Sequence, residues 1–552
     1  MGYGSGTLSR TLPFRIQPDM SQPPPDAAKP HVTLTENPPT SVLGILSRLG
    51  PGLIIAGSIV GSGELITTTS TAGKAGFALL WLILIGCVIK VFVQVEFGRY
   101  SVVTGKTTME GLNEVPGPRI HRLGNWLIWY WFFMFLSSLG QLGGIVGGVG
   151  QAMAISAPLT QTQRDYNAYR QVTTQLEVTE AELRLRENQE DIDQSVVDAL
   201  RVRLAKLREA KASYTVEVPT GHDDRTWAII LTVGTAILLV LGRYKFIEAA
   251  TTALVAGFTF VTVINVVLLQ FNPIWGMTWE DLKFGMSFQL PQGTDRAKAI
   301  SYALATFGII GVGTNELLAY PYFCIEKGYA RYTGPRDETD SWAYRARGWM
   351  RVMRVDAWCS MVVYTFATMA FYILGASILH PIGLDPKGSE MIRLLSVMYE
   401  PIFGPYAPAL FLIGAFAVLY STFFVANAGH ARVCADVVRV LSYGRISRDK
   451  FVGWVRFFSG LLPFVCLFMY ISYPEPRGLI LFSGLMQALM LPMLAAAALY
   501  FRYYRADDRL RPTFVWDAFL WLSALGLLIV ATWALYDSGP KLMNAIQEWQ
   551  AP

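Results

Sequence analysis

The sequence predicts an all-α polytopic membrane protein with about eleven transmembrane helices. Of its 552 residues 52% are hydrophobic and 16% are charged, whereas soluble domains carry roughly 25% charged residues. Apolar runs long enough to cross a bilayer, about 20 residues each, recur from Gly50 to Tyr536. The five cysteines form no CxxC motif and are odd in number, which argues against a disulfide scaffold or a zinc knuckle.

Composition divides the chain into five parts. Residues 1–49 are polar and rich in proline and predict a disordered cytoplasmic tail. Residues 50–158 carry helices one to three, 159–226 form a charged insert, 227–536 carry helices four to eleven, and 537–552 form a short extracytoplasmic tail. The apolar segments lie at 51–72, 77–98, 124–157, 227–241, 247–271, 299–323, 355–379, 406–430, 452–473, 479–501 and 514–536.

Lysine and arginine are distributed unequally between alternate loops. If the N-terminus is cytoplasmic, the inside segments hold a large excess of these residues over the short outside loops, with dense groups at 327–354 and 432–456. Such a bias sets the orientation of membrane proteins. The sequence therefore predicts an integral protein of the plasma (inner) membrane with a cytoplasmic N-terminus.

The insert at 159–226 has apolar residues at helical spacing in two stretches, separated by a polar break. They are Tyr169, Val172, Leu176 and Leu183, followed by Val196, Leu200, Leu204 and Leu207. This pattern predicts an extracytoplasmic antiparallel helical hairpin with arms of about 25 residues each. Two interpretations remain open for it: a solvated hairpin without chemistry, or a docking surface for a protein partner.

One short motif occurs twice, as Val60-Gly61-Ser62-Gly63-Glu64-Leu65 and as Val312-Gly313-Thr314-Asn315-Glu316-Leu317. Its copies lie in spans one and six, as expected for an inverted repeat of five helices each. Each glycine disfavours helix by about 1 kcal/mol, so both spans are predicted to be broken, with Ser62 and Thr314 suited to cap the half-helices that follow. The predicted substrate site comprises Gly61, Ser62, Glu64, Gly313, Thr314, Asn315 and Glu316.

Four polar side chains within the spans are candidates for function. A carboxylate there costs roughly 3 kcal/mol or more, so Glu64 and Glu316 suggest a cation site completed by freed carbonyl oxygens. The alternative is that each glutamate is a structural cap stabilised by the helix dipole. Lys90 in span two and Gln141 in span three are candidate coupling groups or counter-ions. Alternatively, each is a polar contact within the bundle.

Several segments resemble the Nramp family of divalent-metal transporters. They are Gly50-Pro51-Gly52-Leu53 through Trp81, Val103-Thr104-Gly105-Lys106, Ala305 to Gly311, and Leu491-Pro492. The resemblance covers nearly the whole chain except the tail and the insert. It implies the inverted five-plus-five fold of amino-acid-transporter-like carriers and alternating access. It also implies uptake of Mn²⁺ or Fe²⁺ coupled to protons.

The departures from that family fall at its binding site. The family's first-span D-P-G-N is Gly61-Ser62-Gly63-Glu64 here, its sixth-span M-P-H is Asn315-Glu316-Leu317, and its third-span acidic positions are Gln141 and Gly144. Losing a thioether and gaining oxygen ligands favours a hard cation such as Mg²⁺ or Mn²⁺. The predicted metal ligands are Glu64, Asn315 and Glu316, and loss of the titratable groups predicts weak or absent proton coupling.

Together these features predict a secondary transporter that moves a divalent cation across the lipid bilayer by alternating access. No enzymatic activity, cofactor, nucleotide or nucleic-acid partner is expected, and the metal is the transported substrate. An alternative is a carrier of the same fold for an organic solute such as an amino acid or amine, and a weaker one is a non-transporting sensor. Converging carboxylates would favour the metal, whereas a roomy aromatic pocket would favour the organic solute.

Overall fold

The computed structural model describes residues 35–120, 124–187, 194–214, 219–241, 244–293, 296–442, 446 and 448–550, so most of the predicted tail lies outside it. The described residues form helices and no strand, with one isolated bridge between Arg119 and Asn125. The long helices are α4 (Leu80–Thr104), α6 (Trp126–Ser156), α7 (Gln161–Glu187), α8 (Gln194–Ala212), α9 (Asp223–Val240), α10 (Tyr244–Leu269), α15 (Asp340–Leu374), α19 (Ala407–Leu441), α20 (Arg448–Ser472), α21 (Pro476–Tyr500) and α22 (Phe514–Gln550).

Within the described residues, eight helical segments are long and apolar enough to cross a membrane. The other three predicted spans, the first, fourth and fifth, are not among these eight. The first is broken, and α9 begins with Asp223, Asp224 and Arg225. In α10 the apolar segment found among the described side chains is Ala253–Leu269. The predicted class, an all-α integral membrane protein, is confirmed.

Spans one and six are both interrupted, as predicted. The first consists of α2 (Pro51–Ile59), the π-helical turn η1 (Gly63–Thr68) and α3 (Thr69–Ala75). The sixth consists of α12 (Arg296–Ile309) and α13 (Thr314–Lys327), which lie on either side of a glycine-containing break. Gly311 in that break has φ +59°, and a Cβ there would lie 3.1 Å from Cys87 Cα. Glycine is therefore required here both for the left-handed backbone and for the close approach of α4.

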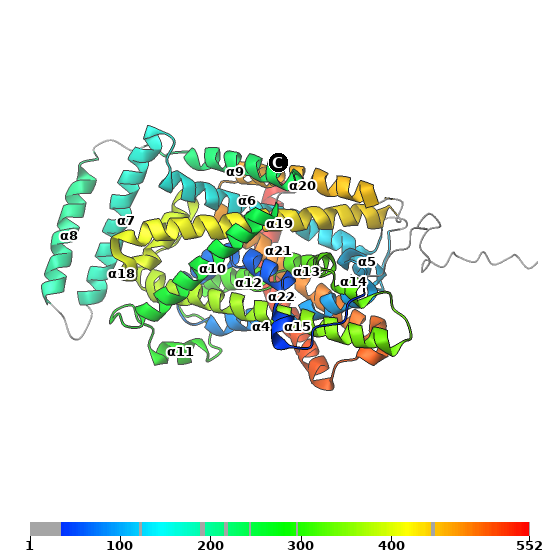
Figure 1. Cartoon of the computed structure of the whole chain (residues 1–552). Coiled ribbons are helices and arrows are strands. Elements are labelled where there is room, and N and C mark those ends of the chain that lie inside the picture. The colour runs from blue at the N-terminus through cyan, green and yellow to red at the C-terminus, as the bar shows by residue number, and fades with distance from the viewer. Residues whose placement is uncertain are drawn as a thin grey trace, which may run out of the picture.

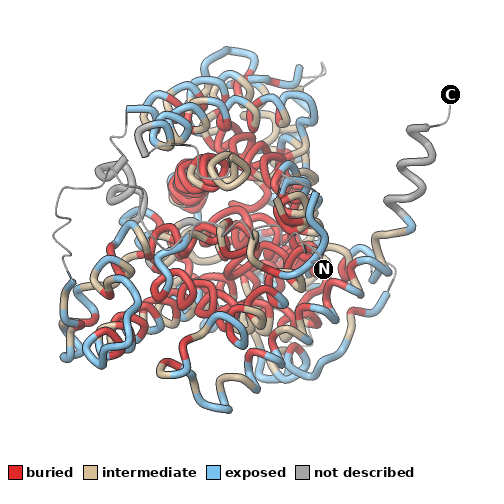
Figure 2. Tube along the Cα trace, turned by 90° about the vertical axis from the view of Figure 1, so that its right-hand side faces the viewer, coloured by how far each residue is buried: buried red, intermediate tan, exposed pale blue. Residues whose placement is uncertain are grey.

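Buried residues gather in the middle of the bundle and exposed residues lie around it (Figure 2). Many exposed side chains are large and apolar, and they concentrate on α9, α20 and α22, for example Ile237, Phe468 and Trp521. A soluble protein rarely exposes apolar surface on this scale. Because these outer helices satisfy their backbone hydrogen bonds internally, the apolar belt suits contact with lipid.

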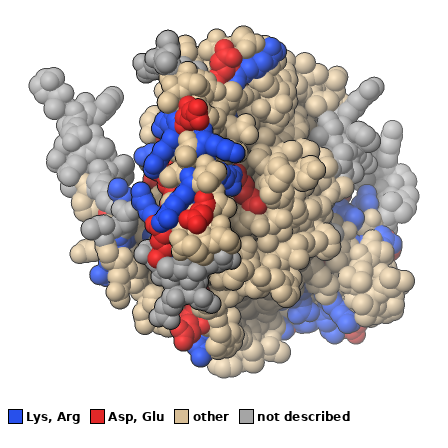
Figure 3. Space-filling model, turned by 90° about the vertical axis from the view of Figure 1, so that its left-hand side faces the viewer, with Lys and Arg blue, Asp and Glu red and all other residues tan. Residues whose placement is uncertain are grey.

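The insert forms the predicted helical hairpin, with α7 and α8 as its arms at one end of the bundle (Figure 1). Charged side chains of both signs gather on this face (Figure 3). Ion pairs join the arms, Arg201 to Glu187 at 2.8 Å and Arg208 to Glu180 at 2.9 Å. We call this end of the bundle the hairpin end. The opposite end carries α5 (Thr108–Glu114) and is called the α5 end. A protein partner for the hairpin stays a prediction.

Candidate functional site

Glu64 is fully buried in the turn η1, immediately after the break in span one. Its Oε2 accepts a hydrogen bond of 3.2 Å from the backbone N–H of Gly61, and its Oε1 accepts one of 3.2 Å from Thr368 Oγ1 on α15. The bond to Gly61 resembles one half of a capping box, because the glutamate reaches back three residues to a free amide. Glu64 therefore stabilises the broken helix as well as placing an acid at mid-span.

Glu316 occupies the matching place in span six, in the first turn of α13, and is partly buried. Its Oε2 lies 2.5 Å from where a Cβ on Gly313 would be. This carboxylate therefore folds back toward the residue three positions earlier, as Glu64 does toward Gly61. The sequence repeat is accordingly matched by a repeated local geometry.

Lys90 of α4 is completely buried between these elements. Its Nζ donates to the carbonyl oxygens of Phe307 and Ile310, the latter at 2.8 Å, and lies 4.9 Å from the ring centroid of Phe307. Both carbonyls belong to the C-terminal end of α12, where a positive charge is favourable. Lys90 also interacts electrostatically with Glu316 and Glu64. Lys90 thus caps the end of α12, and its role as a counter-ion for the two acids stays a prediction.

A small cavity lies where the two breaks meet, with a volume of about 10 Å³, enough for about one water molecule. Its polar lining consists of Ser62, Ser138, Gln141, Asn315, Glu316, Thr422 and His430. No methionine or cysteine is among its lining residues, and its one ring is the imidazole of His430. Glu64 does not line the cavity, although the adjacent Ser62 and Gly63 do.

Hydrogen bonds connect Gln141 of α6 to both halves of the repeat. Its Nε2 lies 3.4 Å from Ser62 Oγ, and its Oε1 accepts from Gln487 Nε2 at 2.6 Å. Thr314 Oγ1 in turn donates to the backbone oxygen of Gln487 at 3.1 Å. Ser62 occupies the predicted N-cap position, before η1, but its side chain makes no capping bond. Thr314 is not a cap, because Gly313 is the N-cap of α13.

Gly61 is glycine because α19 leaves no room for a side chain. A Cβ at this position would lie 2.1 Å from Oγ1 and 2.9 Å from Cβ of Thr422. Such a distance cannot be accommodated unless one of the helices moves. The position that corresponds to a ligating aspartate in the family pattern is therefore filled by Thr422, whose side chain also lines the cavity.

At the hairpin end, polar contacts hold the helices together. Asp385, in the segment that follows α16 (His380–Ile382), pairs with Arg477 of α21, and its Oδ2 lies 3.6 Å from Lys74 Nζ of α3. Nearby, the backbone N–H of Gly388 donates to Glu475 Oε1 at 3.2 Å. The contacts of Asp385 therefore join α3, the part of span one at this end, to α21.

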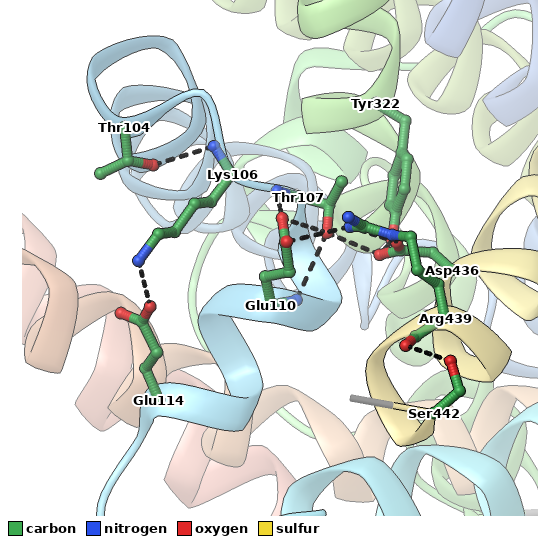
Figure 4. Close-up of polar contacts among 9 residues, drawn as sticks. All are labelled: Thr104, Lys106, Thr107, Glu110, Glu114, Tyr322, Asp436, Arg439 and Ser442. Atoms are coloured by element: carbon green, nitrogen blue, oxygen red, sulfur yellow. Dashed lines mark hydrogen bonds and ion pairs between the residues drawn. The ribbon is translucent and has the colours of Figure 1, made fainter. Parts of the chain in front are cut away.

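At the α5 end, two buried aspartates hold the helices together. Asp356 of α15 accepts from the amide N–H groups of Gly50, at 2.9 Å, and Gly52, at the start of α2, and from Tyr320 OH at 3.1 Å. Asp436 of α19 forms a second cluster (Figure 4). Polar contacts therefore hold the helices together at both ends of the bundle, with the small cavity between them.

Asp436 is fully buried and joins three elements (Figure 4). Its Oδ2 accepts from Thr107 Oγ1 and from Tyr322 OH, each at 2.6 Å, and its Oδ1 accepts from Arg439 Nε at 2.8 Å. Arg439 also pairs with Glu110 at 3.0 Å. The start of α5, α13 and the end of α19 are therefore fastened together.

The predicted site residues thus come together in part. Ser62, Gln141, Asn315 and Glu316 line one cavity, and Glu64 lies beside it, bonded to Gly61 and Thr368. In the described part of the chain, no group of three or more His, Cys, Asp or Glu side chains is arranged to hold a metal ion. A cation here would therefore rely largely on amide, hydroxyl and backbone oxygens, with Glu316 as the carboxylate that faces the cavity.

Sequence reasoning missed Ser138, Thr422 and His430 in the cavity wall and Thr368 beside Glu64. Ser138 lies one helical turn from Gln141 on α6, a spacing that could have marked it. Thr422 and His430 on α19, and Thr368 on α15, are brought in by tertiary packing alone. No local pattern around them distinguishes them from other polar residues in the spans.

A family model described as natural resistance-associated macrophage protein-like, Nramp, matches residues 212–537. This match extends over more than half of the chain and includes one broken helix, α12 and α13. The chain belongs to the Nramp family. The family resemblance predicted from its motifs is therefore confirmed.

Sequence identity to individual proteins is low. An uncharacterized protein of Pasteurella multocida is 21% identical over 497 residues, which cover 89% of this chain and 91% of that protein. The divalent metal cation transporter MntH of Bacillus subtilis is 31% identical over 84 residues, 15% of this chain and 20% of that protein. A crystal structure of a variant of the Eremococcus coleocola manganese transporter matches with a TM-score of 0.54 and 14% identity, covering 90% of this chain and 88% of that one. The predicted transporter fold with broken helices one and six is thereby confirmed.

Proposed function

We propose that this Nramp-family protein is a secondary transporter of a divalent cation, with Mg²⁺ or Mn²⁺ as the favoured substrate. The observation that carries the proposal is the small cavity at the two helix breaks, whose wall offers a carboxylate, amide oxygens and hydroxyls and no sulfur. Hard cations prefer such ligands. The volume of about 10 Å³ also favours an ion over an amino acid or amine in this state.

Asn315 and Glu316 are proposed as direct ligands, with Ser62 and Gln141 as polar neighbours. Glu64 is proposed as the acid that enters the site when span one moves, because its present bonds to Gly61 and Thr368 both lie at the break. Alternating access would then release the contacts of Asp385 at one end of the bundle and those of Asp356 and Asp436 at the other. Proton coupling is proposed to be weak, because glutamine replaces an acid at position 141.

The proposed orientation has a cytoplasmic N-terminus in the plasma membrane, which makes the α5 end cytoplasmic. Arg347, Arg351 and Arg354 on α15 and Arg509 and Arg511 after α21 all lie at that end. This agrees with the excess of positive charge on the inner side of membrane proteins. The hairpin end would then face outward.

The test is flux of Mg²⁺, Mn²⁺ and Ca²⁺ into proteoliposomes that contain the purified protein and a pH-sensitive dye. We expect saturable divalent uptake without a matching pH change, and its loss in Glu64→Gln and Glu316→Gln. Glu326→Gln is the matched control, because Glu326 lies on the same helix as Glu316 but pairs with Arg432 near the surface. If the folded protein transports no divalent metal into the proteoliposomes under any gradient, the proposal is wrong.

A further inference from the structure

A second cavity lies at the α5 end, outside the candidate cation site, with a volume of about 420 Å³. It is bounded by α15, by the end of α4, by residues 38–40 and by the segment 509–512 that precedes α22. Its lining residues include no aspartate or glutamate. Six arginines line it: Arg99, Arg347, Arg351, Arg354, Arg509 and Arg511. Its size lies within the usual range of ligand pockets, about 300–1,000 Å³.

Three of these arginines form a stripe on one face of α15. Arg347, Arg351 and Arg354 are spaced by four and three residues, which places their side chains next to each other. All three are exposed, and none takes part in an ion pair among the described residues. Arg354 is repelled by Arg99 and Arg351 and attracted by Glu96. Like charges at this spacing destabilise a helix, so binding of an anion at the stripe would be favourable.

Arg99, at the end of α4, is a second feature of this cavity that favours an anion. It is 6% exposed, its Nη1 donates to Leu510 O at 3.2 Å, and its Nε lies 3.2 Å from Glu96 Oε2. Its Nη2 is buried and has no hydrogen-bond partner among the described residues. Leaving a charged donor buried without an acceptor is unfavourable. The Arg99 side chain lines the cavity, so its positive charge adds to that of the α15 stripe.

We propose that this cavity binds the phosphate group of an anionic ligand, at a site separate from the cation pathway. The guanidinium group presents two parallel N–H donors that match phosphate oxygens, and arginine is the residue best suited to this recognition. Three of the six arginines pair with acids outside the cavity lining, Arg99 with Glu96, Arg509 with Asp507 and Arg511 with Asp508. The α15 stripe supplies three further positive charges without an ion pair among the described residues, and these favour an anion. Since α4 and α15 span the membrane and their ends bound the cavity, the phosphate comes from an anionic lipid headgroup or from a soluble phosphate compound.

The test uses the purified full-length protein and the double variant Arg351→Gln/Arg354→Gln. Both residues are exposed, so the substitutions are expected to leave the fold intact. Arg331→Gln is the matched control: it removes an exposed charge at the same end, outside the cavity. Retention of phosphatidylglycerol against phosphatidylcholine is measured by native mass spectrometry, and binding of pyrophosphate in detergent is measured by its effect on thermal unfolding.

We expect wild type and Arg331→Gln to bind at least one of the two probes, and the double variant to bind it about tenfold or more weakly. Retention of phosphatidylglycerol without a response to pyrophosphate assigns the site to a lipid headgroup. A response to pyrophosphate assigns it to a soluble phosphate compound. Equal binding by the double variant and the Arg331→Gln control, or no response of wild type to either probe, would overturn the proposal.

Discussion

The Nζ atom of Lys90 donates a hydrogen bond of 2.8 Å to the backbone oxygen of Ile310, at the break in the sixth span. A second bond runs from the same atom to the carbonyl oxygen of Phe307. The end of α12 is therefore neutralised by a tethered positive charge, and these two carbonyls are not free to ligate a substrate ion. This modifies the expectation that freed carbonyl oxygens complete the cation site.

Replacing Lys90 by methionine separates its two roles. The variant leaves the carbonyls of Phe307 and Ile310 without their donor, which is expected to cost about 1–3 kcal/mol per group and to lower the melting temperature. It also removes a positive charge that interacts with Glu316 and Glu64, so divalent binding should strengthen. We expect a lower melting temperature without metal and a larger rise on adding Mg²⁺ than in wild type.

The control for this prediction is Lys106→Met, because Lys106 is exposed and pairs with Glu114 at 2.6 Å. This variant should change neither the melting temperature without metal nor its rise on adding Mg²⁺ by much. A Lys90→Met protein that is as stable as wild type, or that gains less from Mg²⁺, would show that Lys90 does not serve both roles.

The contact between Gly61 and Thr422 predicts the effect of restoring the family's acid. Gly61→Asp alone should lower the free energy of unfolding by about 1–3 kcal/mol, because the new Cβ would lie 2.1 Å from Thr422 Oγ1. Thr422→Gly removes the opposing atoms, so the double variant should be more stable than the sum of the single changes predicts. Thermal unfolding of the three variants in lipid nanodiscs measures this coupling, and simple additivity would contradict it.

The sequence was sufficient to predict the broken helices, because glycines and an acid recur together at Gly61–Glu64 and Gly313–Glu316. It was not sufficient to predict how each carboxylate is used, since Glu64 bonds to its own backbone while Glu316 faces the cavity. The role of Thr422 depends on the packing of α19 against α2, which leaves no periodic signal. Likewise, the arginines on α15 are visible as inner-side charges, but their convergence with Arg99 is a product of the fold.

Asp507 predicts a dependence of stability on pH at the α5 end. Its hydrogen bonds to Arg509, together with the nearby charge of Arg336, lower its pKa to about 2, below the ordinary value of about 3.9. A lowered pKa in the folded state stabilises the protein above the unfolded-state pKa. That contribution is therefore complete at neutral pH and is lost as the pH falls from about 4 toward 2.

Asp507→Asn should accordingly unfold at a lower temperature than wild type at pH 6, and the difference should shrink through this acidic range. Asp508→Asn is the neighbouring control, since Asp508 is highly exposed. The measurement is the melting temperature of each protein as a function of pH. A difference between Asp507→Asn and wild type that stays constant down to pH 3 would exclude the aspartate as the titrating group.

The Asp436 cluster predicts which contact keeps the α5 end closed. Asp436→Asn removes the charge from the bond to Arg439 and weakens the acceptor for Thr107 and Tyr322. Hydrogen bonds to charged groups contribute about 1.5–3 kcal/mol, so the open population at this end should rise roughly tenfold or more. The native thiol of Cys324, fully buried on α13, reports the opening through its rate of maleimide modification.

In membranes, Asp436→Asn should therefore increase labelling of Cys324, measured residue by residue by mass spectrometry. Cys466 of α20, also fully buried, is the internal reference, and its rate should stay unchanged if the opening is local to the α5 end. Glu326→Gln is the control for loss of an ion pair at this end that does not involve Asp436. If Cys324 stays as protected in Asp436→Asn as in that control, the Asp436 cluster does not keep this end closed. The bonds of Asp356 on α15 to the start of α2 would then be the contact that does so.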